Sequence, residues 1–194
     1  MKKFSDCSGV ILAGGQSSRM GFPKESLRYK DKRVIDIILD IFHRLFEEVL
    51  IVTDDKHGLP EFKQAKVIED IIHERGPLGG IYTALKTTSK DKAFFVACDM
   101  PLLQAELIKK FLGISTEDFE CIVPYTQAGV EPLHAIYSTR TLPIIEDLLK
   151  AGDYSIRKLF ERCRCKFIKV DKSESGAFFN VNTPGDLKSL NQDG

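Results

Sequence analysis

Residues 8–15 read Ser8-Gly9-Val10-Ile11-Leu12-Ala13-Gly14-Gly15, an apolar run that ends in two adjacent glycines. A short, continuous apolar run is typical of a strand that is buried on both faces of a parallel sheet. Glycine has no Cβ, so the pair allows the backbone to turn sharply where the strand ends. The stretch therefore predicts a first strand over residues 8–12 that leads directly into a glycine-rich loop.

Strand-like and helix-like segments alternate along the rest of the chain. The expected strands are 48–53, 66–69, 93–98, 119–125, 131–137 and 166–170, and the expected helices are 34–46, 78–88, 104–112, 140–150, 155–161 and one after residue 182. Such alternation is typical of a parallel sheet whose crossover helices cover both faces. The sequence therefore predicts an α/β protein with a doubly wound, mostly parallel sheet, in a single domain over residues 1–194.

Composition and charge exclude several classes of protein. The 194 residues are 43% hydrophobic and 29% charged, as in ordinary folded domains. Lys plus Arg and Asp plus Glu both number 28, so no net charge attracts the protein to nucleic acid or to an anionic membrane. The apolar runs are too short for a membrane span or a signal peptide. Five cysteines without a C-x-x-C pair predict reduced thiols in the cytoplasm and no structural zinc.

The loop after the first strand carries positive charge. Arg19 and Lys24 follow Gly14 and Gly15 within residues 13–24. Backbone N–H groups of a glycine loop, together with two cations, favour the binding of phosphate groups. The spacing matches neither G-x-x-x-x-G-K-[ST] nor G-x-G-x-x-G, and a tight turn with solvated charges is the alternative.

Asp99 comes directly after the strand expected over residues 93–98. Ligands of open α/β sheets bind beyond the carboxyl ends of the strands, so its carboxylate is expected in the binding cleft. Mg²⁺ prefers one or two carboxylates together with phosphate oxygens and waters. Asp99 is therefore a candidate magnesium ligand, and capping of a turn is the alternative.

Residues 12–24 resemble the signature L-A-G-G-x-S-x-R-M-G-x-x-K of the molybdenum cofactor guanylyltransferases, the MobA family. Pro23 stands where this family ordinarily has an acidic residue. Further segments that match in order are Glu69-Asp70, Gly76-Pro77-Leu78-Gly79-Gly80-Ile81, Cys98-Asp99-Met100-Pro101, Pro132-Leu133-His134-Ala135-Ile136-Tyr137 and Phe179-Asn180-Val181-Asn182-Thr183-Pro184. The resemblance covers residues 9–190.

The resemblance implies a three-layer, Rossmann-like nucleotidyltransferase fold and the transfer of GMP from GTP to molybdopterin-bound molybdenum, with release of pyrophosphate. It implies catalytic roles for Arg19, Lys24 and Asp99 and a Mg²⁺ ion held by Asp99. The implied nucleotide-binding residues are Leu12, Ala13, Gly14, Gly15, Lys24, Asp70, Gly76, Gly80 and Asp99. The implied pterin-side residues are Asn180, Asn182 and Arg157. The implied partners are GTP, the molybdopterin cofactor, and molybdoenzyme apoproteins or other cofactor-biosynthesis proteins.

Several of these residues have structural alternatives. Asp70 could pair with His73 or Arg75, and Gly76 to Gly80 could serve only the entry turn of a helix. Thr183 is an ordinary helix N-cap, and Arg157 could belong to a solvated basic face. We expect His134 to be a core residue rather than a base.

Two alternative functions are compatible with the sequence. One is a cytidylyltransferase that uses CTP and acts on molybdopterin or on a polyol phosphate. The other is a carrier that binds GTP or pterin without catalysis.

Overall fold

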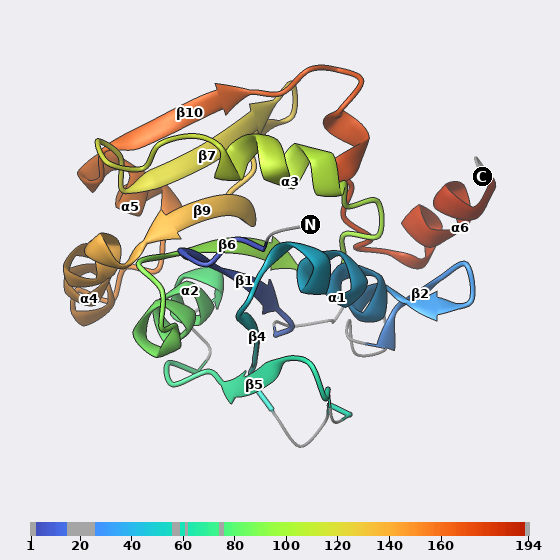
Figure 1. Ribbon diagram of the computed structural model, residues 1–194, viewed down its shortest axis with the longest axis horizontal. Helices are drawn as coiled ribbons and strands as arrows, with labels where there is room; N and C mark the ends of the chain where they lie inside the picture. The colour runs from blue at the N-terminus through green and yellow to red at the C-terminus, as the bar shows by residue number, and fades with distance from the viewer. Residues whose placement is uncertain (1–2, 15–25, 56–58, 61, 74–75, 193–194) are drawn as a thin grey trace.

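The computed structural model describes residues 3–14, 26–55, 59–60, 62–73 and 76–192, and strands and helices alternate along most of the chain (Figure 1). The strands are β1 (Cys7–Leu12), β2 (Arg28–Tyr29), β3 (Lys32–Arg33), β4 (Val49–Thr53), β5 (Lys66–Glu69), β6 (Lys92–Ala97), β7 (Cys121–Thr126), β8 (Gly129–Val130), β9 (His134–Ser138) and β10 (Cys165–Lys169). The helices are α1 (Val34–Leu45), α2 (Gly76–Thr87), α3 (Ala105–Leu112), α4 (Leu142–Lys150), α5 (Ile156–Arg162) and α6 (Pro184–Gln192), with 3₁₀ turns η3 (Thr139–Thr141) and η4 (Ser175–Phe178).

The central sheet has the strand order β10-β7-β9-β6-β1-β4-β5, and β8 pairs with β7. Strand β1 lies in the middle and is parallel to both neighbours, so Leu12 is opposite Val52 on one side and Ala97 on the other. Strand β9 runs antiparallel between β6 and β7. The predicted α/β class with a mostly parallel sheet is confirmed.

Helices cover both faces of this sheet, which gives three layers. One core contains the apolar faces of α1 and α3, and the other contains those of α2, α4 and α5. Successive residues of β1 point to opposite faces, so Ile11 packs in the first core and Val10 in the second, and both side chains are fully buried. This burial on both sides explains the continuous apolar run of β1.

Two features of the fold differ from the sequence prediction. The β2–β3 hairpin was not predicted, because its turn uses Lys30 and Asp31 at φ values of 46° and 62° instead of the usual glycine or asparagine. Strand β9 begins at His134, whereas the expected strand began at Glu131. Pro132 has no N–H to donate to a sheet ladder, which accounts for the later start.

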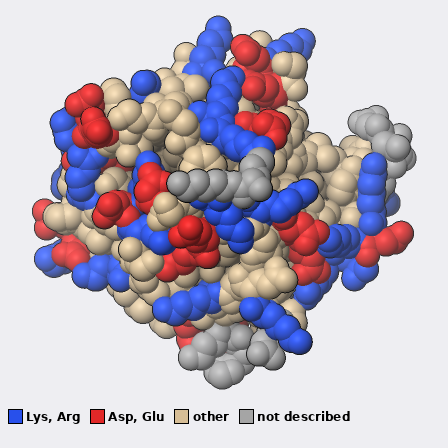
Figure 2. Space-filling model, in the orientation of Figure 1, with Lys and Arg blue, Asp and Glu red and all other residues tan. Residues whose placement is uncertain are grey.

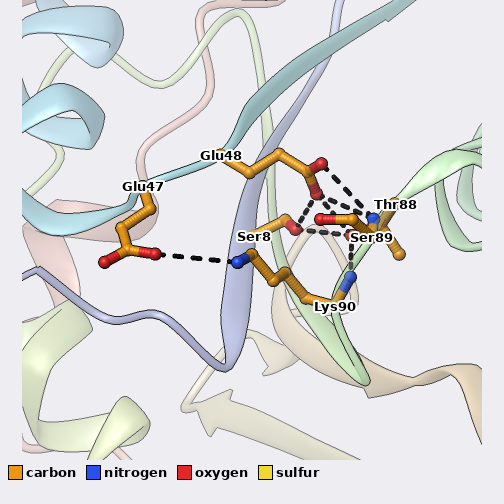
Figure 3. Close-up of polar contacts among 6 residues, drawn as sticks. All are labelled: Ser8, Glu47, Glu48, Thr88, Ser89 and Lys90. Atoms are coloured by element: carbon orange, nitrogen blue, oxygen red, sulfur yellow. Dashed lines mark hydrogen bonds and ion pairs between the residues drawn. The ribbon is translucent and has the colours of Figure 1, made fainter.

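A polar network joins the amino ends of β1 and β4 to the end of α2 (Figure 3). The Oε2 atom of Glu48 lies 2.5 Å from Ser8 Oγ and 2.7 Å from Thr88 Oγ1, and Ser89 N–H donates to the same carboxylate. The two hydroxyl groups lie 2.5 Å from each other. This network links three elements at the amino ends of the parallel strands.

Surface charge agrees with the balanced composition. Figure 2 shows Lys and Arg side chains interspersed with Asp and Glu side chains over the face that it draws. Within the described part of the chain, no helix combines the length and the apolar character that a membrane crossing requires.

Candidate active site

A cavity of about 1040 Å³ opens at the carboxyl edge of the sheet, where β1, β4, β5 and β6 end. This edge is where open α/β sheets bind their ligands. Predicted site residues from five separate segments line its wall: Leu12, Gly14, Asp70, Gly76, Gly80, Asp99, Asn180 and Asn182. The fold therefore brings together residues that lie up to 170 positions apart, from 12 to 182.

The backbone continues the hydrogen bonding of the sheet just beyond the end of β1. Ala13 N–H donates to the carbonyl of Val52, while the carbonyl of Leu12 accepts from Cys98 N–H. The Ala13 side chain is buried in the core beneath α1 and α3 and does not line the cavity. A Cβ on Gly14 would lie 2.9 Å from Asp54 Oδ2 and 3.3 Å from Asp54 N, so a larger residue here would force the Asp54 side chain to shift.

Three predicted residues of the same loop, Gly15, Arg19 and Lys24, lie outside the described residues. Their assignment to phosphate binding rests on the sequence.

Asp99 lies two residues beyond the end of β6, and it is only 3% exposed. Its backbone carbonyl accepts a hydrogen bond of 2.9 Å from Val181 N–H. This contact holds residues 180–182, which are far along the chain, beside Asp99. Both segments line the cavity, as the resemblance implies for a site that joins two substrates.

Asp70 follows β5 and is 6% exposed. Its Oδ1 atom accepts from Thr83 Oγ1 of α2 at 2.5 Å and from Ile72 N–H at 3.0 Å. Thr83 Oγ1 in turn accepts from Ile71 N–H. Within the described residues Asp70 forms no ion pair with His73, while Arg75 lies outside them. The carboxylate is therefore oriented by α2 and its own loop.

Gly76 and Gly80 place the start of α2 against the cavity. Helix α2 begins at Gly76, two residues earlier than predicted, and Gly76 has a φ of +60°. A Cβ on Gly80 would lie 3.0 Å from Leu12 Cδ2, so glycine allows α2 to pack closely on β1. Gly80 thus has a packing role in addition to its position on the cavity wall.

Asn180 and Asn182 both line the cavity, as expected from their alternation in the sequence. The Nδ2 group of Asn180 donates to the carbonyl of Phe178. Asp186 accepts from the N–H groups of Asn182 and Thr183, and Thr183 Oγ1 accepts from Asp186 N–H. These reciprocal hydrogen bonds make Thr183 the N-cap residue that directly precedes α6.

Arg157 is not among the residues that line the cavity. It lies in the first turn of α5, where its side chain is 90% exposed and pairs with Glu161 at 3.6 Å. The structure does not bring Arg157 together with Asn180 and Asn182, and its position agrees with the alternative of a solvated basic face.

His134 is fully buried at the start of β9. Its ring lies 4.4 Å from that of Phe178, and the rings of Phe94 and Phe111 approach it edge-on. Burial lowers the pKa of His134 to about 3. His134 is thus a core residue, as expected, and it supports the segment that carries Asn180.

Sequence reasoning missed three ionisable residues of the cavity wall, Asp54, His73 and Glu131. Asp54 directly follows β4, so the rule used for Asp99 could have found it. The sequence indicates for His73 only a pairing with Asp70. For Glu131 the apolar pattern of residues 131–137 predicts a strand, which hides its position in a connecting segment.

The residues of the cavity fit a magnesium ion that is shared with a substrate. Among the described residues no group of three His, Cys, Asp or Glu side chains could hold a metal by itself. Asp99 supplies one carboxylate to the cavity wall, which matches the preference of Mg²⁺ for few protein ligands, substrate phosphates and waters.

Comparison with known proteins gives the family. Residues 9–167 match the family described as MobA-like NTP transferase domain. A probable molybdenum cofactor guanylyltransferase of Clostridium perfringens (strain SM101 / Type A) is 34% identical over 191 residues, covering 94% of this chain and 95% of the relative. One of Methanothermobacter thermautotrophicus is 34% identical over 192 residues, covering 93% and 97%.

Solved structures share the fold. The molybdopterin-guanine dinucleotide biosynthesis protein A of Archaeoglobus fulgidus superposes with a TM-score of 0.82 at 24% identity, covering 96% of this chain and 97% of the other. A protein of Aquifex aeolicus VF5 has a TM-score of 0.77 at 30% identity, covering 91% and 93%. The Rossmann-like nucleotidyltransferase fold is therefore confirmed, and the chain belongs to the MobA-like NTP transferase family.

Proposed function

We propose that this protein transfers GMP from GTP to the terminal phosphate of molybdopterin-bound molybdenum, which yields the guanine dinucleotide cofactor and pyrophosphate. The observation that carries the proposal is the single cavity that joins Gly14, Asp70 and Asp99 to Asn180 and Asn182. Relatives named probable molybdenum cofactor guanylyltransferase, which match over nearly the whole chain, support it.

In this reaction an oxygen of the acceptor phosphate attacks the α-phosphorus of GTP, a P–O bond forms, and pyrophosphate leaves. The protein's task is to place two anions in line and to stabilise the charge that builds on the phosphates. Leu12, Ala13, Gly14 and Gly15 would present the loop backbone to the nucleotide. Arg19 and Lys24 would stabilise its phosphates.

Asp70 would bind the nucleoside through Oδ2, because its Oδ1 is already held by Thr83 and Ile72. Gly76 and Gly80 let the start of α2 approach the same ligand. Asn180 and Asn182, held beside Asp99, would contact the pterin substrate with their amide groups. Arg157, whose side chain points away into solvent, would need to move to take part.

Asp99 would hold Mg²⁺ together with phosphate oxygens and waters. When bound, this ion supplies positive charge that stabilises the phosphates and orients them. Asp99 itself is fixed in position by the packing that leaves it 3% exposed.

The proposed partners and location follow from the reaction. The product would pass to molybdoenzyme apoproteins or other cofactor-biosynthesis proteins. We place the protein in the cytoplasm, because Cys7, Cys98, Cys121, Cys163 and Cys165 are all free thiols, as is usual in a reducing compartment.

Incubation with Mg²⁺, molybdopterin-bound molybdenum and each of the four nucleoside triphosphates tests the proposal. We expect pyrophosphate release and a guanine dinucleotide with GTP only, identified by mass. A cytosine dinucleotide formed with CTP would assign the protein to the cytidylyltransferases. Binding of GTP without any product in a single turnover would identify it as a carrier.

A further inference from the structure

Asp54 and Glu131 are carboxylates of the cavity wall that have no role in the function proposed above. Glu131 lies in the connection between β8 and β9, with Pro132 and Leu133, and all three residues line the cavity. Because β9 is antiparallel to β6, the start of β9 lies at the carboxyl edge of the parallel strands. Glu131 is therefore on the same edge as Asp99 and Asp70.

Hydrogen bonds hold Glu131 and its carboxylate in place. Its backbone N–H donates to the carbonyl of Pro124 at 2.9 Å, which ties the connection to β7. Thr126 Oγ1 accepts from Ala128 N–H at 3.1 Å, so its own proton is available to Glu131 Oε1, also at 3.1 Å. The carboxylate is thus oriented by a donor whose direction is itself fixed.

The charge of Glu131 lacks a cationic partner. Among the described residues none forms a salt bridge with it, and burial raises the pKa of its carboxyl group although the Thr126 hydrogen bond opposes this shift. A partly desolvated carboxylate gains most from a ligand that offers two parallel N–H donors. It would instead repel a phosphate group.

Glu131 and Asp70 lie at opposite ends of the cavity. Strands β9 and β5 are separated by β6, β1 and β4, which is four strand spacings or about 19 Å at about 4.8 Å each. Asp99 and Gly14 lie between these ends, after β6 and β1. This arrangement suits an extended dinucleotide, with a heterocycle at each end and the phosphates in the middle.

The segment that carries Asn180 leads to the same end. Phe178 packs on His134, three residues after Glu131, and Val181 N–H reaches the carbonyl of Asp99. The end of the cavity that contains Glu131 is therefore the end next to the proposed pterin-side amides.

We propose that Glu131 determines specificity for the second substrate, because its carboxylate accepts the two adjacent N–H donors of the 2-amino-4-oxo edge of the pterin. Pro132 and Leu133 provide an apolar surface beside this edge. This inference rests on the proposed function. Guanine presents the same donor edge, so the experiment has to separate the acceptor from the nucleotide.

The first experiment compares Glu131→Gln with the wild type in steady-state kinetics. An amide cannot accept both N–H groups, so we expect the KM for molybdopterin-bound molybdenum to rise about tenfold to a hundredfold, with the KM for GTP changed less than twofold. Glu106→Gln, whose side chain is 82% exposed on α3, is the matched control and should leave both constants unchanged.

A second measurement needs no nucleotide and no turnover. Pterin and lumazine are fluorescent and differ in the 2-amino donor, which lumazine replaces by a carbonyl oxygen. The wild-type protein should bind pterin about tenfold more tightly than lumazine, and Glu131→Gln should lose this preference. Glu131→Asp, which keeps the charge, should retain part of it.

The outcomes separate the two proposals. Unchanged KM values in Glu131→Gln, or a rise only in the KM for GTP, would overturn the role of Glu131. A wild-type protein that forms no dinucleotide with any triphosphate would overturn the proposed function, while the preference for pterin over lumazine would still test Glu131. Equal binding of pterin and lumazine by the wild type would refute the inference directly.

Discussion

The two edges of the same sheet differ in whether their carboxylates line a cavity. At the amino edge, Glu48, Ser8 and Thr88 form a closed set of hydrogen bonds among the protein's own groups (Figure 3). At the carboxyl edge, Asp70, Asp99 and Glu131 face a cavity. Polar groups that satisfy one another stabilise the fold, whereas polar groups that face a cavity are available to a ligand.

The largest effect is expected from a substitution at the carboxyl edge of the sheet. Asp99→Asn should lower kcat/KM about 10³-fold, because it removes the one carboxylate proposed to hold Mg²⁺, and the Tm should stay within a few degrees. Asp118→Asn, at an exposed position, is the control with the same chemical change. A fully active Asp99→Asn would remove this residue from the metal site.

Lys24→Ala tests the loop that lies outside the described residues. If the lysine acts as one preorganised electrostatic donor, the rate of transfer at saturating GTP should fall about 10²- to 10³-fold. Lys172→Ala, at an exposed position, is the control. An unchanged rate would show that the phosphates are stabilised by other groups.

His134 packs against Phe178, in the segment that leads to Asn180, and its titration makes the stability of the fold depend on pH. Burial lowers its pKa from 6.5 to about 3, so between these pH values the unfolded chain binds a proton that the folded chain excludes. The contribution of His134 to the free energy of unfolding should therefore fall by about 1.4 kcal/mol for each pH unit from 6.5 down to about 3.

Replacement by leucine tests this dependence. His134→Leu should show a flatter decline of stability between pH 7 and pH 5 than the wild type, measured by urea denaturation. His43→Leu, at a half-buried position on α1, should change the slope less. Equal slopes for the wild type and His134→Leu would mean that another group dominates acid unfolding.

Glu48→Gln disrupts the hydrogen-bonded network at the amino edge of the sheet. Burial alone would raise the pKa of Glu48, but hydrogen bonds from Ser8, Thr88 and Ser89 outweigh it and lower the pKa. A lowered pKa means that the ionised carboxylate stabilises the fold at neutral pH, and that this contribution disappears as the pH falls through the folded-state value.

We expect Glu48→Gln to lower the free energy of unfolding by about 1 kcal/mol at pH 7, with kcat unchanged. Its neighbour Glu47 is a matched control, because its side chain is 51% exposed and pairs with Lys90 at 3.6 Å (Figure 3). Glu47→Gln should change stability by less than about 0.5 kcal/mol. A loss of activity in Glu48→Gln would show that the two edges are coupled.

Local sequence predicted most of the fold. The apolar run of β1 and the helical spacing of α1 each reflect burial against a sheet, and this burial leaves a periodic trace in the sequence. The β2–β3 hairpin left no such trace, since its turn contains Lys30 and Asp31 at positions where glycine is usual. The late start of β9 was hidden because apolar residues in a connection resemble those of a strand.

The sequence by itself determined the α/β class and the position of Asp99 just beyond the end of a strand, because each depends on short-range patterns. Only the tertiary structure decided which side chains share the cavity. The bond from Val181 N–H to the carbonyl of Asp99 and the antiparallel direction of β9 join segments that are far apart in the chain. Pairing of distant strands depends on the packing of the whole sheet, and this packing places Glu131 beside the site. The exposure of Arg157 depends on which face of α5 packs against the rest of the protein.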